Sequence, residues 1–493
     1  MLTITRREFL KGAAAFGSFL GGRIFAAPIG WKHEGEPNLV FGILADTHLN
    51  TSRDGKPVFS PWKLKDNRWT GDPLKFLTSA LKYFRAQNVD AIMHCGDFAE
   101  RGQVSEIRFH ADVWRKVFPN DLAPDGHRVA RLFVTGNHDL DGLERGKSLN
   151  PDYAVRVRNA FQSDIAGNWE RIWGEPYEPV WHKEVKGYHF FGQNWEEVDG
   201  GKLAPLVNDG RETYGLDNQS KPFFLVSHAP CKTLNEALRP YRNSVGFFGH
   251  YHESAASWNV IRFYTSSQPW IECPTCSLFG ANWLLRGKLP REVSGEESKG
   301  VGRQGYVVRV YDDMLVIERH EFWKGGKIGA DWVMPLGKVP HPFSKGELLK
   351  VIGEPQFRKN VELKVECVKS KSGEDAAKIS IPLADGNPNS RVYAYEVVIE
   401  VRGTRDEVRG TRYEGRGTRD EGRGTRDEGR GRLRKAVYAA GVNMGIGHEP
   451  NGGVTTLEIP KSELPPGKTL TVAVRPLTSL GTSGKAIMTT FKV

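Results

Sequence analysis

The stretch GILADTHLN, residues 42–50, runs apolar from Ile43 to Ala45 and then places Asp46 and His48 two positions apart. Because the side chains of a strand alternate between its two faces, Asp46 and His48 would project together from the carboxyl end of a strand. A carboxylate and an imidazole on the same side form half of a metal site. A solvated turn after a core strand is the alternative interpretation of this stretch alone, so the choice depends on the rest of the chain.

Strand-like and helix-like patterns alternate after residue 37. Buried strands followed by polar residues are predicted at 38–46, 89–97, 128–139, 222–228 and 244–252. Apolar residues at helical spacing fill the first two intervals: Leu74, Leu77, Leu81 and Phe84, then Val104, Ile107, Ala111, Trp114 and Phe118. This alternation predicts an α/β fold with a parallel sheet and helices on its faces, in which ligands gather outside the carboxyl ends of the strands.

The polar residues at these strand ends are of the kinds that bind metal ions. They are Asp46, His48, Asp97, Asn137, His138, Asp139, His228, His250 and His252. If these side chains gather at one edge of the sheet without a metal, their polar atoms are left unpaired in a partly buried place. Two bound cations would give these atoms partners. Oxygen and nitrogen donors without sulfur favour two divalent or trivalent ions of Fe, Zn or Mn.

In this order, the blocks D-x-H, G-D, G-N-H-D, H and G-H-x-H resemble the calcineurin-like metallophosphoesterase superfamily over roughly residues 38–335. The resemblance implies a two-sheet α/β sandwich that carries two metal ions. It also implies a role for each ligand: Asp46, His48 and His252 for the first ion, Asn137, His228 and His250 for the second, and Asp97 as the bridge.

The same resemblance implies the reaction, which is hydrolysis of a phosphate mono- or diester by metal-bridged hydroxide. His138 matches the non-ligand catalytic histidine and would act as general acid, with Asp139 orienting it. Arg101, in G-D-x-x-x-R-G, matches an arginine that contacts phosphate in the serine/threonine phosphatase branch. A structural ion pair at a helix start is the alternative for Arg101.

The substrate is left open between a phosphorylated small molecule and an envelope-derived phosphoester. Selectivity is predicted to come from the loops at 60–72, 140–221 and 266–287, whose tryptophans could stack a base or sugar. Packing of those tryptophans on the core is the alternative.

The N-terminus, residues 1–27, reads as a removable export signal. Thr5-Arg6-Arg7-Glu8-Phe9-Leu10-Lys11 resembles the twin-arginine signal, although neither Ala26 nor Ala27 has the preferred small residue two places before it. An ordinary basic amphipathic N-terminus is the alternative. The resemblance implies export to the periplasm, the cell envelope or the medium, with no membrane span after the signal is removed.

The second half of the chain differs in character from the first. After a phosphoesterase domain at 38–340 and a linker at 341–356, residues 357–493 contain only short strand-like segments, which predicts a small β-sandwich of immunoglobulin or fibronectin type. An Arg/Gly-rich seven-residue repeat at 402–432 interrupts this domain as a disordered loop. Two alternatives remain open: an envelope-binding or scaffold protein acting through the sandwich, and an RNA-binding arm formed by the repeat.

The net charge and the cysteine content of the chain bear on these predictions. Of the net charge of +10, three units come from residues 1–27 and three from 402–432, and the remaining +4 argues against a nucleic-acid-binding body. The chain has five cysteines, an odd number that implies no disulfide framework. Cys273 and Cys276 have the spacing of half a zinc knuckle, but a local disulfide or two free thiols is favoured. Nothing in the sequence indicates the oligomeric state.

Overall fold

The computed structural model describes thirteen segments of the chain: residues 35–51, 57–58, 73–140, 160–216, 221–264, 268–276, 293–294, 303–322, 324–370, 373–386, 391–401, 432–442 and 450–493. The predicted signal at 1–27, the whole of the predicted loop at 60–72 and nearly all of the repeat at 402–432 lie outside the described residues. Parts of the loops at 140–221 and 266–287 lie outside them as well.

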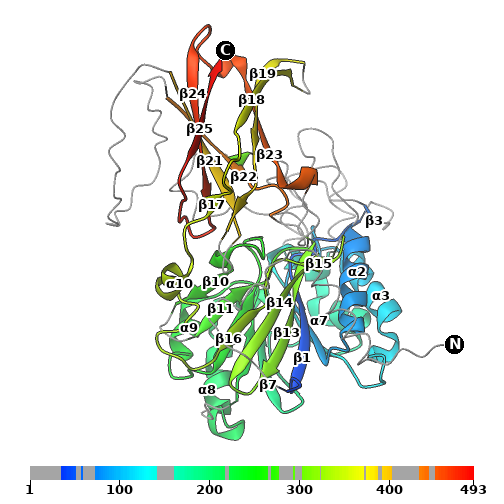
Figure 1. Cartoon of the computed structure of the whole chain (residues 1–493). Coiled ribbons are helices and arrows are strands. Elements are labelled where there is room, and N and C mark those ends of the chain that lie inside the picture. The colour runs from blue at the N-terminus through cyan, green and yellow to red at the C-terminus, as the bar shows by residue number, and fades with distance from the viewer. Residues whose placement is uncertain are drawn as a thin grey trace, which may run out of the picture.

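The first sheet has seven strands and carries the opening stretch of the sequence near its centre. Its order is β15 (Gly326–Lys327), β14 (Met314–Glu321), β13 (Gln304–Tyr311), β1 (Leu39–Leu44), β4 (Ala91–Cys95) and β5 (Ala130–Val134), with β16 (Trp332–Pro335) also paired to β14. Strands β1, β4 and β5 are parallel, and β13 joins β1 antiparallel. Helices α2 (Pro73–Ala86), α3 (Val104–Val117) and α7 (Ile165–Trp173) cover its outer face (Figure 1).

The second sheet has six strands, and its face packs against the first sheet. Its order is β10 (Ile261–Phe263), β11 (Pro269–Glu272), β9 (Ser244–Phe248), β8 (Phe223–Val226), β7 (Tyr188–Gln193) and β6 (Val180–Val185). Helices α8 (Leu203–Thr213) and α9 (Lys232–Ala237) pack on its outer face. Between the sheets, the Phe41 ring lies 5.3–5.9 Å from the rings of Phe190, Phe224 and Phe247. The predicted two-sheet α/β sandwich is therefore confirmed.

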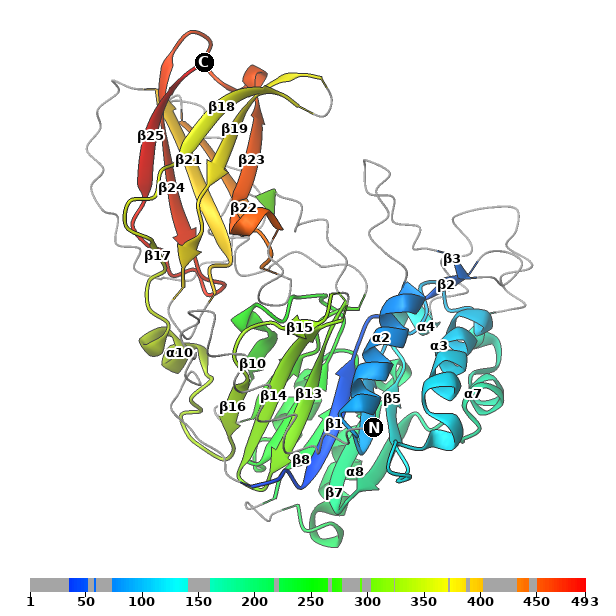
Figure 2. The same ribbon diagram turned by 45° about the vertical axis from the view of Figure 1, so that its right-hand side comes forward.

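The C-terminal region forms further sheets at one end of this sandwich (Figure 2). One has the order β12 (Val293–Ser294), β22 (Arg432–Tyr438), β21 (Ala394–Val401), β24 (Thr469–Leu477) and β25 (Ile487–Lys492), and another the order β18 (Lys364–Lys369), β19 (Asp375–Ile381) and β23 (Thr455–Pro460). A short two-stranded sheet of β17 (Gln356–Phe357) and β20 (Ala384–Asp385) also belongs to this region. Another, of β2 (Asn50–Thr51) and β3 (Pro57–Val58), lies in the phosphoesterase part. The all-β character of this region agrees with the sequence, whereas its assignment to the immunoglobulin or fibronectin type stays a prediction.

Two features depart from the simple two-part division of the chain. Helix α10 (Lys345–Val351) lies inside the predicted linker and buries Leu348 against the core. Strand β12 belongs by sequence to the phosphoesterase part, yet it pairs with β22, so that Val293 lies opposite Ala436. The two parts of the chain thus share a sheet, which no local pattern in the sequence indicates.

A buried histidine in α3 makes the stability of this fold sensitive to acid. His110 packs among aromatic rings, 4.8 Å from Phe98 and 5.8 Å from Trp173 between ring centres. Burial lowers its pKa from 6.5 to about 3. The unfolded chain therefore binds a proton below about pH 6.5 that the folded chain does not, so this contribution to stability is lost as the pH falls from about 6.5 toward 3.

We expect the His110→Leu variant to weaken this dependence. Between pH 7.5 and pH 5, the free energy of unfolding of the wild type should fall by about 2 kcal/mol more than that of the variant. Urea unfolding at the two pH values measures the difference. Ile107→Val, a core change in the same helix without a titratable group, should keep the wild-type dependence, and an equal dependence in all three proteins would contradict the assignment.

Candidate metal centre

The seven predicted metal ligands meet where the carboxyl ends of the two sheets adjoin. Asp46 and His48 follow β1, Asp97 follows β4, and Asn137 opens the short helix α4 (Asn137–Leu140) after β5. His228 follows β8, and His250 and His252 follow β9. Parallel strands bring their carboxyl ends to one edge, which is why residues so distant in sequence converge.

Four of these residues form a first group. The ligand atoms of Asp46, His48, Asp97 and His252 all lie within 4.8 Å of one another. His252 Nε2 lies 3.1 Å from His48 Nε2 and 3.2 Å from Asp46 Oδ1. His48 Nε2 lies 3.5 Å from Asp97 Oδ2.

A second group adjoins the first and shares Asp97 with it. Asn137 Oδ1 lies 3.1 Å from His228 Nε2 and 3.2 Å from His250 Nδ1. His228 Nε2 also lies 3.2 Å from Asp97 Oδ2, the same oxygen that faces His48. The other carboxylate oxygen of Asp97 accepts the backbone N–H of His138 at 2.8 Å. One oxygen of Asp97 therefore faces both groups.

The protonation of the imidazoles tests whether cations fit these groups. His228 Nδ1 lies 2.7 Å from the carbonyl oxygen of Cys95, which can only accept, so Nδ1 carries the hydrogen. In the neutral ring, Nε2 then presents a lone pair to Asn137 Oδ1 and Asp97 Oδ2, which are acceptors too. His48 repeats the pattern, because its Nδ1 lies 2.8 Å from Glu100 Oε2. Lone pairs that converge in this way fit a metal ion, and imidazole ligands commonly donate their second N–H to such an oxygen.

The charges of the site lead to the same requirement for cations. Burial alone would lower the pKa of both histidines, but the Glu100 carboxylate raises that of His48 to about 9 and Asp97 raises that of His228 to about 10. Burial would raise the pKa of the Asp46 carboxyl, but His252 holds it below its usual range. The buried carboxylates thus stay ionised and need nearby positive charge, which protons or metal ions can supply.

Five of the seven ligands have left-handed backbones. The φ angles are 53° for Asp46, 44° for His48, 56° for Asp97, 79° for His250 and 58° for His252. Each such angle costs a non-glycine residue on the order of 1–3 kcal/mol. Backbone hydrogen bonds hold the strained turns, including Asp46 N to Gly96 O at 3.0 Å. The fold therefore fixes the backbone at these positions.

Glycines precede the ligands because the backbone passes too close for a side chain. A Cβ on Gly136 would lie 2.2 Å from Asp97 Oδ1 and 2.6 Å from Asp97 N, and one on Gly249 would lie 2.7 Å from Asp46 Oδ2. The glycines of the G-N-H-D and G-H-x-H blocks are thus required by packing against the ligands themselves.

We expect Gly136→Ala to displace Asp97 and to reduce bound metal from two ions per chain to fewer than one. Metal analysis of the purified protein, together with its thermal midpoint, measures the effect. Gly346→Ala is the matched control, because nothing lies within 4 Å of a Cβ at that helical position. Full metal content in Gly136→Ala would show that Asp97 does not need this close contact.

His138 and Asp139 lie beside the groups, and the side chain of each meets backbone atoms of neighbouring loops. His138 Nδ1 lies 2.9 Å from the carbonyl oxygen of Glu100, and its ring meets that of His48 edge to face at 4.4 Å. The Asp139 carboxylate instead accepts the backbone N–H groups of Ala99 and Gly136, both at 2.8 Å. The contact observed at His138 Nδ1 is thus to Glu100, while Asp139 ties together two loops of the site.

Arg101 lies at the start of α3. Its backbone N–H donates to Glu106 Oε2 at 2.9 Å, and that of Gln103 donates to the same oxygen at 3.1 Å. Glu106 therefore caps the helix and fixes the turn that carries Arg101. Contact of the guanidinium with phosphate stays a prediction.

Two neighbours of the metal ligands escaped prediction. Glu100 is 4% exposed and faces His48, but a lone glutamate three residues after Asp97 gives no signal by itself. Trp195 lies nearly parallel to the His250 ring at 5.8 Å and edge to face with the His228 ring at 5.5 Å. The position of Trp195 within the loop at 140–221, which was predicted to govern selectivity, is the one feature of the sequence that pointed to it.

Two cysteines lie near the site, and Cys276 donates its backbone N–H to Ala45, the residue before Asp46, at 3.1 Å. Cys273 and Cys276 are both buried free thiols in the described part of the chain. This agrees with the free-thiol alternative.

Residues 39–254 match the family described as Calcineurin-like phosphoesterase. No curated protein matches the chain. Among the described residues, every helix is too short or too polar to span a membrane.

Solved structures similar to the chain include a dimetal phosphatase from Danio rerio, with 12% identity over 61% of this chain and 99% of that one and a TM-score of 0.35. A purple acid phosphatase from yellow lupin (Lupinus luteus) seeds has 11% identity over 61% of this chain and 55% of that one, with a TM-score of 0.39. The match at 39–254 spans the strands and turns that carry all seven ligands. The chain thus contains a calcineurin-like phosphoesterase domain and is a metal-dependent phosphoesterase.

Proposed function

We propose that this enzyme hydrolyses a phosphate mono- or diester at a dinuclear centre. Asp46, His48 and His252 would hold one ion, Asn137, His228 and His250 the other, and Asp97 would bridge them. The observation that carries the proposal is the position of Asp97 Oδ2, which lies 3.5 Å from His48 Nε2 in one group and 3.2 Å from His228 Nε2 in the other. Two ions bound there would make coordinated water a stronger nucleophile and offset the charge on the phosphate oxygens.

His138 is suited to proton transfer through one defined atom. Its Nδ1 carries a hydrogen because it faces the Glu100 carbonyl, so Nε2 is the atom that exchanges a proton. We assign to it protonation of the leaving-group oxygen, the role of a general acid. Glu100 positions His48 and His138 together, since its carboxylate faces the first ring and its carbonyl the second.

Asp139 and Arg101 complete the proposed site. Asp139 holds the Ala99 and Gly136 amides, so it keeps the loop after Asp97 in register with the turn before Asn137. Arg101 would contact a phosphate oxygen of the substrate from the capped start of α3. The substrate itself is proposed to be a phosphorylated small molecule or an envelope-derived phosphoester, met after export through the twin-arginine route.

Hydrolysis of two aryl phosphates tests the proposal. The full chain, reconstituted with Mn, Zn or Fe, is given bis(p-nitrophenyl) phosphate and p-nitrophenyl phosphate, with a chelated sample as control. Metal-dependent turnover supports the proposal, and a preference separates a diesterase from a monoesterase. If the protein binds two ions but hydrolyses neither these esters nor nucleotides and sugar phosphates, the proposal is wrong and the envelope-binding alternative gains support.

A further inference from the structure

We propose that the C-terminal region positions the metal centre, and that Ser479 is the residue through which it does so. The inference deepens the proposed function, because it concerns how His252 is held for the first ion. It rests on the segment from His252 to Asn259, called here the His252 turn.

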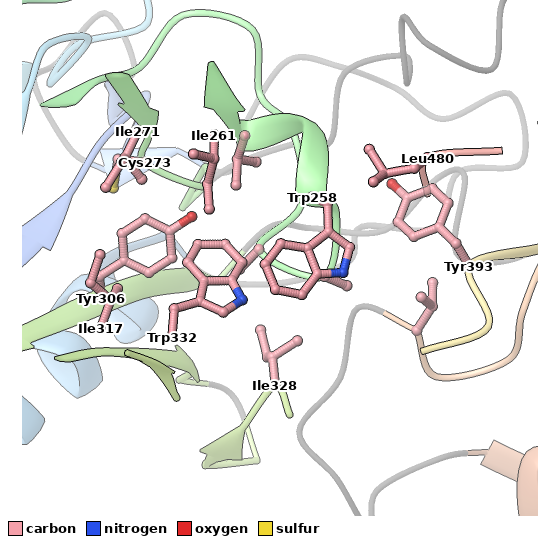
Figure 3. Packing of buried hydrophobic residues seen from close by; sticks show 14 of the residues in the cluster. Trp258, Ile261, Ile271, Cys273, Tyr306, Ile317, Ile328, Trp332, Tyr393 and Leu480 are labelled. Carbon is pink, nitrogen blue, oxygen red and sulfur yellow. The ribbon is translucent and has the colours of Figure 1, made fainter. Parts of the chain in front are cut away.

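The His252 turn ends in a core shared by the two parts of the chain. Trp258 stacks on Trp332 of β16, with ring centres 5.3 Å apart and an interplanar angle of 27°. Figure 3 shows Trp258 between this tryptophan on one side and Tyr393 and Leu480 of the C-terminal region on the other. All four side chains belong to one continuous buried cluster. The C-terminal sheets are therefore packed into the phosphoesterase core.

Ser479 fixes the far end of the turn by two hydrogen bonds. Its Oγ accepts the backbone N–H of Trp258 at 3.0 Å, and its carbonyl oxygen accepts Asn259 Nδ2 at 3.3 Å. Ser479 is 1% exposed, so water cannot replace it without rearrangement. The partners are separated by 221 and 220 residues in sequence.

The rest of the turn is tied to the phosphoesterase sheets. The backbone N–H of Glu253, the residue after His252, donates to Glu272 Oε1 at 2.9 Å. Ala255 is held from both sides, by Gln304 Oε1 on its N–H and by Arg319 Nη1 on its carbonyl oxygen, each at 2.9 Å. Ser257 Oγ then donates to Glu253 Oε2 at 3.3 Å, which links the end of the turn back to its start. The Ser257–Glu253 bond is the route by which a shift at Trp258 would reach the residue next to His252.

His252 depends on this anchorage more than His48 and His228 do. Its side chain is 21% exposed, against 4% for His48 and 0% for His228. Its backbone is left-handed, with φ of 58°, so the turn must hold a strained conformation at this residue. The backbone of the turn therefore helps to set the direction in which this partly exposed ring points. Changes to groups that orient a ligand typically weaken metal binding about 10- to 100-fold.

A point variant tests this better than removal of residues 357–493, which would expose the buried Trp258 and Trp332. The full-length apoprotein is titrated with Co²⁺, and each equivalent is followed by its visible absorption. We expect Ser479→Ala to bind one equivalent about tenfold more weakly than the wild type and the other with unchanged affinity.

Two control variants separate positioning from general damage. Ser462→Ala removes a C-terminal hydroxyl that donates to Glu374 at an exposed site, and it should leave both affinities unchanged. Val474→Ala removes buried volume from β24, and it should lower the thermal midpoint without selective loss of one equivalent.

Unchanged Co²⁺ affinity in Ser479→Ala, or the same selective loss in Val474→Ala, would overturn the inference. Failure of the proposed function has a different signature, since the wild type would then bind two equivalents and hydrolyse no phosphate ester. In that case the Co²⁺ titration still decides the role of Ser479.

Discussion

The Asp97→Asn variant is expected to lose both metal ions and, with them, its turnover. Both carboxylate oxygens of Asp97 act as acceptors, Oδ1 for the His138 backbone N–H at 2.8 Å and Oδ2 toward His48 and His228. An amide replaces one of these acceptors by an NH₂ donor, so either orientation leaves a mismatch. Metal affinity should fall by at least about 100-fold, because the bridging charge disappears as well.

Metal analysis after gel filtration, paired with the aryl phosphate assay, measures both losses. Asp90→Asn is the matched control. Asp90 comes directly before β4, at the end of the strand opposite to Asp97. The Asp90 carboxylate accepts the Val40 backbone N–H at 2.9 Å. This control should retain two ions. If Asp97→Asn kept one ion at full affinity, Asp97 would belong to a single group and would not be a bridge.

The His138→Gln variant should behave in the opposite way, keeping both ions while turnover falls by about 10² or more. Its backbone N–H still binds Asp97, so the metal groups stay intact, but glutamine cannot deliver a proton as an imidazolium does. The loss should be large for an alkyl phosphate ester, whose alkoxide needs a proton to leave. For a p-nitrophenyl ester it should be smaller, because nitrophenolate leaves unaided.

Comparing the two leaving groups therefore distinguishes an acid from a residue that only shapes the site. His189→Gln on β7 is the control, since that ring pairs with His182 at 3.0 Å on another part of the second sheet. An equal loss on both esters, or full activity on the alkyl ester, would rule out the acid assignment.

The ligands were predictable because each carries a local signal: an apolar strand before it and, for Asp97, Asn137 and His250, a glycine directly ahead. The α/β sandwich followed from the same alternation. Contacts through the backbone gave no such signal, so the amide partners of Asp139 and the Cys95 carbonyl behind His228 could only come from the structure.

The contacts between the two parts of the chain could not be predicted from the sequence either. A serine near a turn, such as Ser479, looks like any other, and its partner Trp258 lies 221 residues away. The helix α10 in the predicted linker has a similar cause. Its apolar pattern is too short to predict a helix, and the helix is stabilised by the burial of Leu348 in the core.

The pairing of β12 with β22 has a consequence for the order of events during synthesis. Val293 cannot meet Ala436 until the ribosome has added the intervening residues and the exit tunnel has released them. Such long-range pairings delay folding relative to local ones. If Ser479 fastens the His252 turn, tight loading of the first ion is a late step, reached only when nearly all of these 493 residues have emerged.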